Sequence, residues 1–356
     1  MQTRHRVIPG SAANIDLPPE TVDLVVTSPP YPMIEMWDQS FSGQGAGVAS
    51  HLERGEGPAA FEAMHRVLDE VWGECYRVLC PGGFACINIG DATRSIAGEF
   101  RLYTNHARIV VACEALGFQS LPAVIWRKQT NAPNKFMGSG MLPSGAYVTL
   151  EHEYILILRK GGKRVFGPDD RERRSKSAFF WEERNSWFSD LWDFKGVQQR
   201  LGSNEARARS GAFPFELGFR LTCMYSMQGD LVLDPFLGTG TTSAAALACA
   251  RHSIGVEADT GLLPVIEGTI EAGATLGNER QLARLRAHEE FVRRYEADKG
   301  RSPGHTNTTY GFPVVTRQEI DLVLPSATAV HRGTGHEWVA DHETLHDHGE
   351  PQLDLF

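Results

Sequence analysis

Long apolar runs and paired cysteines are both missing from this chain of 356 residues. No window of about 18 apolar residues occurs, so we expect no membrane span, and residues 1–7 lack the apolar core of a signal peptide. The six cysteines include no Cys-x-x-Cys pair and stand among apolar residues. We interpret them as reduced core residues of a cytoplasmic protein, and we predict neither disulfides nor a metal site.

The chain also has fewer basic than acidic residues: 35 Lys and Arg against 44 Asp and Glu give a formal net charge of −9. Residues 317–356 account for most of this excess, with eight acidic residues and two arginines. Residues 159–176, in contrast, contain eight Lys or Arg and three acidic residues. A basic segment on an acidic protein is typical of a phosphate-binding surface, although a solvated loop has the same composition.

Residues 22–31 read Val-Asp-Leu-Val-Val-Thr-Ser-Pro-Pro-Tyr and carry the most functional information in the chain. The apolar run that opens them has the composition of a β-strand. Pro29 and Pro30 then fix φ at about −65° and supply no N–H donors, so the carbonyls of this turn are free to face a ligand. With the hydroxyl of Ser28 and the flat face of Tyr31, they suit a planar exocyclic amine.

A second motif, Asp-Leu-Val-Leu-Asp-Pro-Phe-Leu-Gly-Thr-Gly-Thr-Thr, occupies residues 230–242. It combines a short strand, the acidic Asp234 and a glycine turn, and an alanine-rich helix former follows. The pattern is neither Gly-x-Gly-x-x-Gly nor a P-loop, because no lysine follows its second glycine. Glu257 ends the next expected strand, where a carboxylate commonly holds ribose hydroxyls. The sequence therefore predicts a cofactor that contains a nucleoside.

Together the two motifs resemble those of the amino-methylating DNA methyltransferases that use S-adenosylmethionine. Ser-Pro-Pro-Tyr is similar to their catalytic motif and Asp-Pro-Phe-x-Gly-x-Gly-Thr-Thr to their cofactor motif, in the order of the permuted beta group. The resemblance covers about residues 5–275 and includes residues 68–91, 152–160 and 213–221. It implies an α/β fold, a circularly permuted Rossmann-like methyltransferase with a mostly parallel seven-stranded sheet and an inserted target-recognition region.

The resemblance also implies roles for the residues at matching positions. The catalytic residues would be Ser28, Pro29, Pro30 and Tyr31. The residues that bind S-adenosylmethionine would be Ser11, Phe213, Pro214, Asp234, Pro235, Phe236, Gly238, Thr239, Gly240, Thr241, Thr242 and Glu257. Two positions depart from the family pattern: Ser11 stands where an acidic residue is common, and residues 209–212 lack the His or Lys that often precedes Phe-Pro.

Methyl transfer to an exocyclic amine requires acceptors that aim the nitrogen, and the candidates are Ser28 Oγ and the Pro29 carbonyl, with Tyr31 as stacking partner. The base cannot be reached inside a duplex, so it must flip out. In the family, Ser in this motif usually accompanies cytosine N4, whereas Asp or Asn more often accompanies adenine N6. A site-specific cytosine-N4 DNA methyltransferase is therefore expected, with adenine N6 as the alternative. Cys80-Pro81, in an ordinary turn, does not indicate cytosine-C5 chemistry.

Two other classes of protein stay open at this point. An oxidoreductase on a doubly wound sheet would also bind a nucleotide, but the missing Gly-x-Gly-x-x-Gly argues against it. A non-catalytic DNA-binding module could retain a degenerate cofactor fold, but the intact Asp234, Gly238, Gly240, Glu257 and Tyr31 argue against that.

Helical and strand patterns alternate up to about residue 126, which indicates a mostly parallel sheet covered on both faces. Residues 127–150 and 161–212 interrupt this alternation with basic, amide and aromatic side chains, so we place target recognition at about residues 127–212, inside a catalytic domain of residues 1–275. The glycine-rich residues 43–57 are predicted to be a mobile loop over the base pocket. The candidate DNA-binding residues are Arg127, Lys128, Lys135, Lys163, Arg164, Arg171, Arg173, Arg174 and Lys176.

The last part of the chain lies outside the resemblance. We predict an accessory segment at residues 276–330, with a charged helix at 278–299, and an acidic, disordered tail at 331–356. The final residues, Gln352, Leu353, Asp354, Leu355 and Phe356, resemble the peptide by which bacterial replication proteins bind the sliding clamp. Expected partners are double-stranded DNA, this clamp and a cognate restriction endonuclease, and the expected location is the cytoplasm, at the nucleoid.

Overall fold

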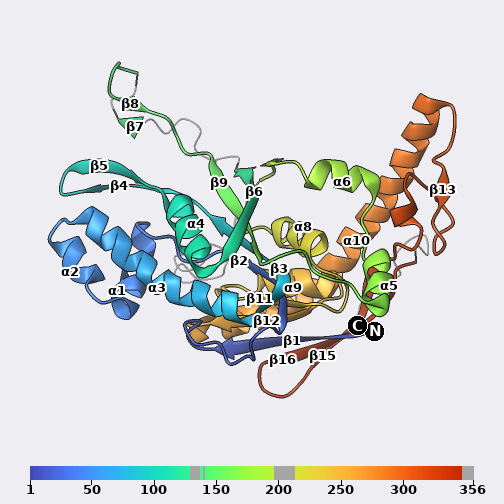
Figure 1. Ribbon diagram of the computed structural model, residues 1–356, viewed down its shortest axis with the longest axis horizontal. Coiled ribbons are helices and arrows are strands. Elements are labelled where there is room, and N and C mark those ends of the chain that lie inside the picture. Colours follow the sequence, from blue (N-terminus) through green and yellow to red (C-terminus); the bar gives the residue numbers. More distant parts are fainter. Residues whose placement is uncertain (129–136, 139–140, 196–212, 347–356) are drawn as a thin grey trace.

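The computed structural model describes residues 1–128, 137–138, 141–195 and 213–346 (Figure 1). One ten-stranded sheet forms its centre, in the order β10-β6-β9-β3-β2-β11-β12-β1-β16-β15. β9 and β16 run antiparallel to the strands with which they pair, and the other pairings in this sheet are parallel. The strands are β1 (Gln2–Pro9), β2 (Val22–Thr27), β3 (Leu79–Ile89), β6 (Phe118–Arg127), β9 (His152–Lys160), β10 (Leu191–Asp193), β11 (Leu231–Asp234), β12 (His252–Glu257), β15 (Pro325–Arg332) and β16 (Glu337–Thr344).

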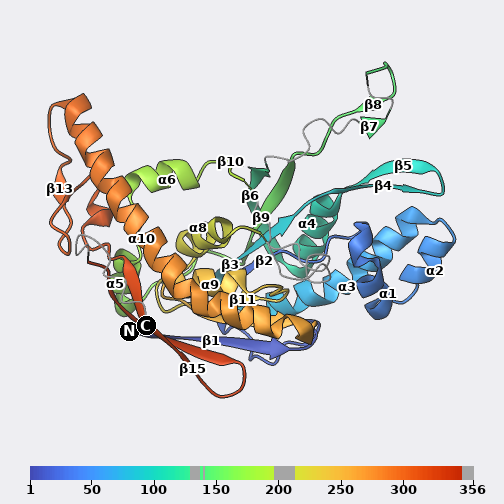
Figure 2. The ribbon, with the colours of Figure 1, turned by 180° about the vertical axis from the view of Figure 1, so that it is seen from behind.

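Helices cover both faces of the sheet, as the alternating patterns predict. The α3 (Gly57–Val78) and α4 (Asn105–Leu116) helices pack on one face, in a core that includes Leu68, Trp72 and Ile109. The α8 (Phe215–Tyr225), α9 (Thr241–Ala248) and α10 (Leu263–Lys299) helices cover the opposite face, which Figure 2 turns toward the viewer. The buried strands β2 and β11 lie between these two layers, and this is why they are apolar on both sides.

Smaller elements surround this three-layer body. The hairpin of β4 and β5 and the short pair of β7 and β8 both project beyond the end of the sheet near α4 (Figure 1). None of the described helices is both long and apolar enough to cross a membrane. The remaining elements are η1 (Glu35–Trp37), α1 (Asp38–Gln44), α2 (Val48–Glu53), β4 (Ala92–Ile96), β5 (Glu99–Tyr103), β7 (Met137–Gly138), β8 (Ala146–Tyr147), α5 (Pro168–Lys176), α6 (Trp181–Trp187), η2 (Thr260–Leu262), β13 (His305–Thr306), β14 (Pro313–Val314) and η3 (Arg317–Glu319).

The predicted α/β fold with a mostly parallel sheet is confirmed, but the sheet has ten strands rather than seven. The expected seven strands are the neighbouring strands β6, β9, β3, β2, β11, β12 and β1. β10 extends one edge beyond β6, and the antiparallel hairpin of β15 and β16 extends the other edge beyond β1.

This hairpin corrects the prediction of a disordered tail from residue 331 onward. Residues 337–341 pair with β1, from Arg6 opposite Glu337 to Gln2 opposite Asp341. Trp338 and Ala340 alternate inward and pack with Val7 in one hydrophobic cluster. The acidic residues Glu337 and Asp341 occupy the other face of the strand, and the polar His342 continues the buried face, so the two-residue period of apolar residues is hard to recognise in the sequence.

Two further expectations also need correction. The segment predicted as a mobile loop, residues 43–57, contains the end of α1 and all of α2, and these two short helices bury Phe41 and Val48. The charged helix predicted at 278–299 is the second half of α10, which is continuous from Leu263 and ends where Gly300 adopts a left-handed conformation with φ of 65°. The accessory segment therefore begins inside a helix that packs on the catalytic core.

Buried histidines join the C-terminal hairpin to β1. Thr3 Oγ1 lies 2.9 Å from His5 Nε2 and 2.8 Å from His342 Nε2. Burial, with a contribution from His342, lowers the pKa of His5 to about 3. Burial, with the nearby N-terminal amine, lowers the pKa of His342 to about 4. Both rings are thus neutral in the folded protein under conditions where an unfolded histidine takes up a proton.

Acid should therefore weaken the fold through these rings. An unfolded histidine has a pKa of about 6.5, so below this pH the unfolded state binds protons that the folded state does not, and stability falls as the pH is lowered. When the pH is lowered from about 7 to about 5, the free energy of unfolding should fall in both proteins. The fall should be about 2 kcal/mol smaller for His342→Gln than for the unsubstituted chain. Urea unfolding at both pH values measures this.

The matched control is His331→Gln, which changes a side chain that is 63% exposed on the neighbouring strand β15. It should keep the pH dependence of the unsubstituted chain. An unchanged pH dependence in His342→Gln would contradict the assignment of a neutral buried ring.

Candidate active site

The two sequence motifs meet at the carboxyl ends of the central strands. β2 and β11 are parallel neighbours, and β12 is the next strand. Their carboxyl ends therefore point the same way and lead directly into Ser28, Asp234 and Glu257. Ligands of open α/β sheets bind in crevices outside the carboxyl ends of the strands, and this end of the sheet has such a crevice.

Asp234 joins the motifs physically. Thr27 Oγ1, 207 residues away in the sequence, donates a hydrogen bond of 2.6 Å to Asp234 Oδ1, and Thr242 Oγ1 donates one of 2.6 Å to Oδ2. The Phe236 backbone N–H also donates to Oδ1, at 3.0 Å. Burial raises the pKa of Asp234 to about 6, although these three donors oppose the shift. The residue predicted to contact the cofactor therefore also holds the cofactor turn against the catalytic strand.

Glu257 organises the glycine turn in a similar way. Its carboxylate accepts hydrogen bonds from the backbone N–H of Gly238 and of Asp259, each at 2.7 Å. Gly238 and Gly240 have φ of 57° and 88°, a left-handed conformation that favours glycine. Burial raises the pKa of Glu257. The carboxylate lies half-buried at the cavity wall, where it can still accept hydrogen bonds from a ligand.

A cavity of about 540 Å³ opens between these elements. It brings together all four predicted catalytic residues and most of the predicted cofactor residues. Pro214, Thr239 and Gly240 do not line it: Pro214 precedes α8, Thr239 bonds to Thr241, and Gly240 precedes α9. The predicted residues that line the cavity are Ser28, Pro29, Pro30, Tyr31, Ser11, Phe213, Asp234, Pro235, Phe236, Gly238, Thr241, Thr242 and Glu257.

Three polar residues that the motifs do not include surround the Tyr31 hydroxyl. Tyr31 Oη donates to Glu153 Oε2 at 2.9 Å and accepts from Asn88 Nδ2 at 2.9 Å. Asn88 Nδ2 also donates to Glu153 Oε2 at 2.7 Å, and Lys128 Nζ pairs with Glu153 Oε1. Burial, and then the charge of Glu153, raises the pKa of Tyr31 well above its ordinary value.

Sequence reasoning identified Lys128 only as a DNA contact and missed the other two residues. Asn88 lies between two isoleucines on β3, Glu153 lies near the start of β9, and each is almost fully buried. A polar residue inside an otherwise apolar strand was the available signal. Its meaning depends on β3 and β9 being adjacent, and the sequence does not show that adjacency.

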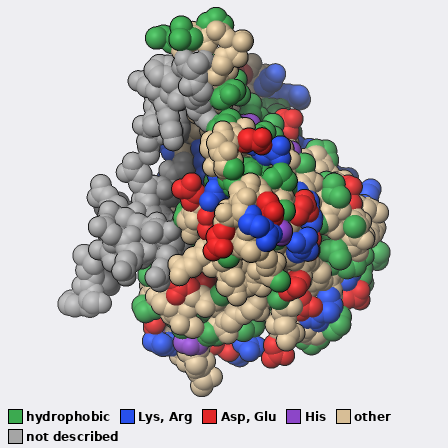
Figure 3. All heavy atoms as spheres, turned by 90° about the vertical axis from the view of Figure 1, so that its left-hand side faces the viewer, with side chains coloured by type: hydrophobic (Ala, Val, Ile, Leu, Met, Phe, Trp, Pro, Cys, Tyr) green, Lys and Arg blue, Asp and Glu red, His purple; other side chains and the backbone are tan. Residues whose placement is uncertain are grey.

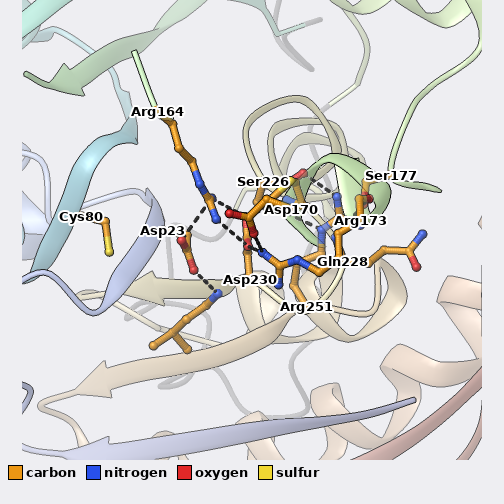
Figure 4. Close-up of polar contacts among 12 residues, drawn as sticks. Asp23, Cys80, Arg164, Asp170, Arg173, Ser177, Ser226, Gln228, Asp230 and Arg251 are labelled. Carbon is orange, nitrogen blue, oxygen red and sulfur yellow. Dashed lines mark hydrogen bonds and ion pairs between the residues drawn. The ribbon is translucent and has the colours of Figure 1, made fainter. Parts of the chain in front are cut away.

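Two of the predicted basic DNA contacts, Arg164 and Arg173, lie away from the cavity. Arg164 binds Asp230 at 2.8 Å and Asp23 at 3.1 Å, and Arg173 binds Asp230 at 3.0 Å (Figure 4). Asp23 and Asp230 stand at the amino ends of β2 and β11, so these arginines are at the edge of the sheet opposite the cavity. Asp230 is 1% exposed, and both arginines neutralise it.

The other basic candidates that the structure describes are divided between the two ends of the strands. Lys163, Arg171, Arg174 and Lys176 are exposed on or near α5, on the same side as Arg164. Arg127 pairs loosely with Glu151 and Asp193 near the end of β6. Lys135 lies outside the described residues, as do residues 209–212 and the peptide at 352–356. Figure 3 looks at the end of the molecule that carries α1, α2 and α3, where basic and acidic side chains intermingle.

Among the described residues, no group of His, Cys, Asp and Glu is arranged to hold a metal ion. The site instead offers a cavity that Ser28, Pro29 and Tyr31 line together with Glu257. This arrangement can hold a nucleoside beside a planar amine.

Comparison with known proteins agrees with this geometry. Residues 22–267 match the N6/N4 methyltransferase family model, described as DNA methylase. The chain is 48% identical over 328 residues to the type II methyltransferase M.MthZI of Methanothermobacter thermautotrophicus, with 91% of each chain covered. It is 49% identical over 280 residues to the type II methyltransferase M.MjaI of Methanocaldococcus jannaschii, covering 75% of this chain and 91% of that protein.

Among solved structures, a putative DNA modification methylase of Thermus thermophilus, in complex with S-adenosyl-L-methionine, matches with a TM-score of 0.58 and 34% identity. The match covers 76% of this chain and 95% of that one. From the family model and the similarity to the curated relatives, the chain belongs to the N6/N4 family of DNA methyltransferases.

The ion pairs at the opposite edge generate a prediction. Arg164→Ala would leave Asp23 and Asp230 with less charge compensation, so the free energy of unfolding should fall by about 2–3 kcal/mol. DNA affinity, measured on folded protein at fixed salt, should change less than about twofold. Chemical unfolding and fluorescence anisotropy measure the two effects.

Arg171→Ala is the matched control, because Arg171 is exposed on α5. It should change neither stability nor DNA affinity. If either variant lost more than about tenfold in DNA affinity while its stability was unchanged, this end of the sheet would belong to the DNA-binding surface, against the prediction.

Proposed function

We propose that this chain transfers a methyl group from S-adenosylmethionine to N4 of a cytosine that flips out of double-stranded DNA at a specific site. The observation that carries the proposal is the single cavity that Ser28 and Tyr31 share with the glycine turn and Glu257. Methyl donor and target amine must meet for direct transfer, and here the two motifs line one space.

The cofactor assignment is supported by the family, by the relative in complex with S-adenosyl-L-methionine and by the chemistry of the cavity. Phe213 and Phe236 offer apolar surface to a purine, and Glu257 offers a carboxylate to ribose hydroxyls. When bound, S-adenosylmethionine supplies a methyl group activated by its sulfonium. No further chemistry on the cofactor is required of the protein.

Positioning the target amine is the task of the catalytic turn. Ser28 Oγ donates its own hydrogen to Tyr31 Oη at 3.1 Å and accepts a long hydrogen bond of 3.5 Å from Asn88 Nδ2, so a lone pair remains available to accept from the amine. Pro29 also lines the cavity, and its carbonyl is the second candidate acceptor. Two acceptors oriented in advance aim the nitrogen and stabilise the charge that develops on it.

Serine at the first position of the motif supports cytosine N4 over adenine N6, because serine usually accompanies N4 methylation in enzymes with this motif. Adenine N6 is the second candidate, and it would use the same acceptors. The type II names of the two curated relatives support action at a defined sequence beside a cognate restriction endonuclease. An enzyme with this substrate acts at the nucleoid.

The target base can be identified directly. DNA from a methylation-free bacterial host that expresses the chain should carry N4-methylcytosine within one sequence motif when read by single-molecule sequencing. Ser28→Ala and Tyr31→Ala should each reduce the signal at least about 100-fold. Ser120→Ala, which removes a β6 hydroxyl that bonds to Glu114, should leave it unchanged.

A signal on adenine would replace cytosine N4 with adenine N6 and retain the mechanism. Absence of any modified base, with cofactor and DNA both bound, would favour the non-catalytic DNA-binding module and contradict the proposal.

Sliding-clamp binding is a separate proposal, based on the sequence of residues 352–356. Leu353, Leu355 and Phe356 are suited to a hydrophobic groove on a partner. Deletion of residues 352–356 should abolish clamp binding in solution and leave methylation of short duplexes unchanged. Surface plasmon resonance on immobilised clamp measures the first effect, and retained binding would end this proposal.

A further inference from the structure

A chain of hydrogen bonds leads away from the proposed amine-binding position into the protein. Ser28 Oγ donates to Tyr31 Oη at 3.1 Å, and Tyr31 Oη donates to Glu153 Oε2 at 2.9 Å. The first residue of this chain lines the cavity beside the predicted acceptor carbonyl, and the last lies 7% exposed on β9. None of the assigned roles described above requires a buried carboxylate at its end.

The carboxylate sets the direction of every bond in the chain. An ionised carboxylate can only accept, so the Tyr31 hydroxyl must donate to Glu153. The two lone pairs of Tyr31 Oη then accept from Ser28 and from Asn88 Nδ2, at 3.1 and 2.9 Å. Ser28 has therefore spent its only hydrogen inside the chain. Hydrogen bonds that follow one another in this way polarise each other, which makes Ser28 Oγ a better acceptor.

Methylation of an exocyclic amine must also release a proton. The nitrogen forms a bond to the methyl carbon as that carbon leaves sulfur, and nitrogen then carries one hydrogen too many and a positive charge. The hydrogen on the nitrogen that faces Ser28 Oγ is in place to enter the chain.

We propose that Glu153 is the terminal proton acceptor of the methyl-transfer reaction, reached through Ser28 and Tyr31. The amine proton moves to Ser28 Oγ as the Ser28 proton moves to Tyr31 Oη and the Tyr31 proton moves to Glu153 Oε2. Charge balances, because the sulfonium becomes a neutral thioether, the carboxylate becomes a neutral acid and the product is a neutral methylated amine. No oxidant or further reactant is needed.

The surroundings of Glu153 suit this role. Lys128 Nζ pairs with Oε1, so the charge of the waiting carboxylate is balanced, and Asn88 Nδ2 holds Oε2 at 2.7 Å. Lys128 is 41% exposed, so the pair reaches solvent, to which the proton can be lost after the reaction.

The titratable neighbours of Glu153 along β9 are His152 and Tyr154, whose rings contact each other. Apart from Lys128, Tyr31 is the only titratable group that contacts Glu153 through a hydrogen bond among the described residues. Beyond Asn88 on the same side of the sheet, Asp91 is paired with His106 at 2.8 Å.

This inference rests on the proposed function only to the extent that an exocyclic amine is methylated, and it is the same for cytosine N4 and adenine N6. Single-turnover methylation of a short duplex, followed from about pH 5 to about pH 9, tests it on the full-length chain. The variants are Glu153→Gln, Tyr31→Phe and the double variant. The control is Glu290→Gln, the same change at an exposed position of α10.

The relay predicts that Glu153→Gln lowers the single-turnover rate at about pH 8 by about 100-fold or more. It also predicts that the rate of this variant depends less on pH than the rate of the unsubstituted chain. Tyr31→Phe keeps the stacking ring but breaks the chain, so the double variant should be no slower than the slower single variant. Cofactor and DNA dissociation constants should change less than about threefold.

Glu153→Gln with a rate and pH profile like those of Glu290→Gln would overturn the relay. So would a double variant in which the two losses multiply, because that result makes the residues independent supports of the site. If the unsubstituted chain bound cofactor and DNA but methylated no base, the proposed function would fail instead, so the two failures are distinguishable.

Discussion

The buried hydrogen bonds of Asp234 are the constraint on which the rest of the site depends. This carboxylate accepts from Thr27 at the end of the catalytic strand and from Thr242 at the start of α9. It thereby sets the distance between two segments that the chain separates by 207 residues. A buried carboxylate is costly unless donors surround it, and the three donors present are those that close the cavity. The same hydrogen bonds therefore stabilise the fold and assemble the site.

The two edges of the sheet use charge in opposite ways. At the carboxyl edge, Glu153 and Lys128 form a pair that lines the cavity and stays connected to solvent. At the amino edge, Arg164 and Arg173 neutralise Asp230, which has almost no exposure, and thereby attach α5 to the core. A pair of the first kind can exchange a proton with a ligand, whereas the second network is a structural support.

Much of the fold and most of the cavity could be predicted from the sequence, because the motifs at residues 22–31 and 230–242 are local and each encodes a strand and its turn. Residues 152–160, which the family resemblance included, form β9. What the sequence hid depends on neighbours across the sheet. Glu153 is held by Asn88 on β3, and Arg164 pairs with Asp23 on β2. His342 of the C-terminal hairpin meets His5 of β1 through Thr3.

A crystal structure with a duplex that contains the recognition site and a non-reactive cofactor analogue would test the central claim most directly. The account predicts one base turned out of the helix, with its exocyclic nitrogen within about 3.2 Å of Ser28 Oγ and with the analogue's purine beside Phe236 and its ribose beside Glu257. A flipped base bound away from Ser28, or an analogue bound outside this cavity, would contradict the account.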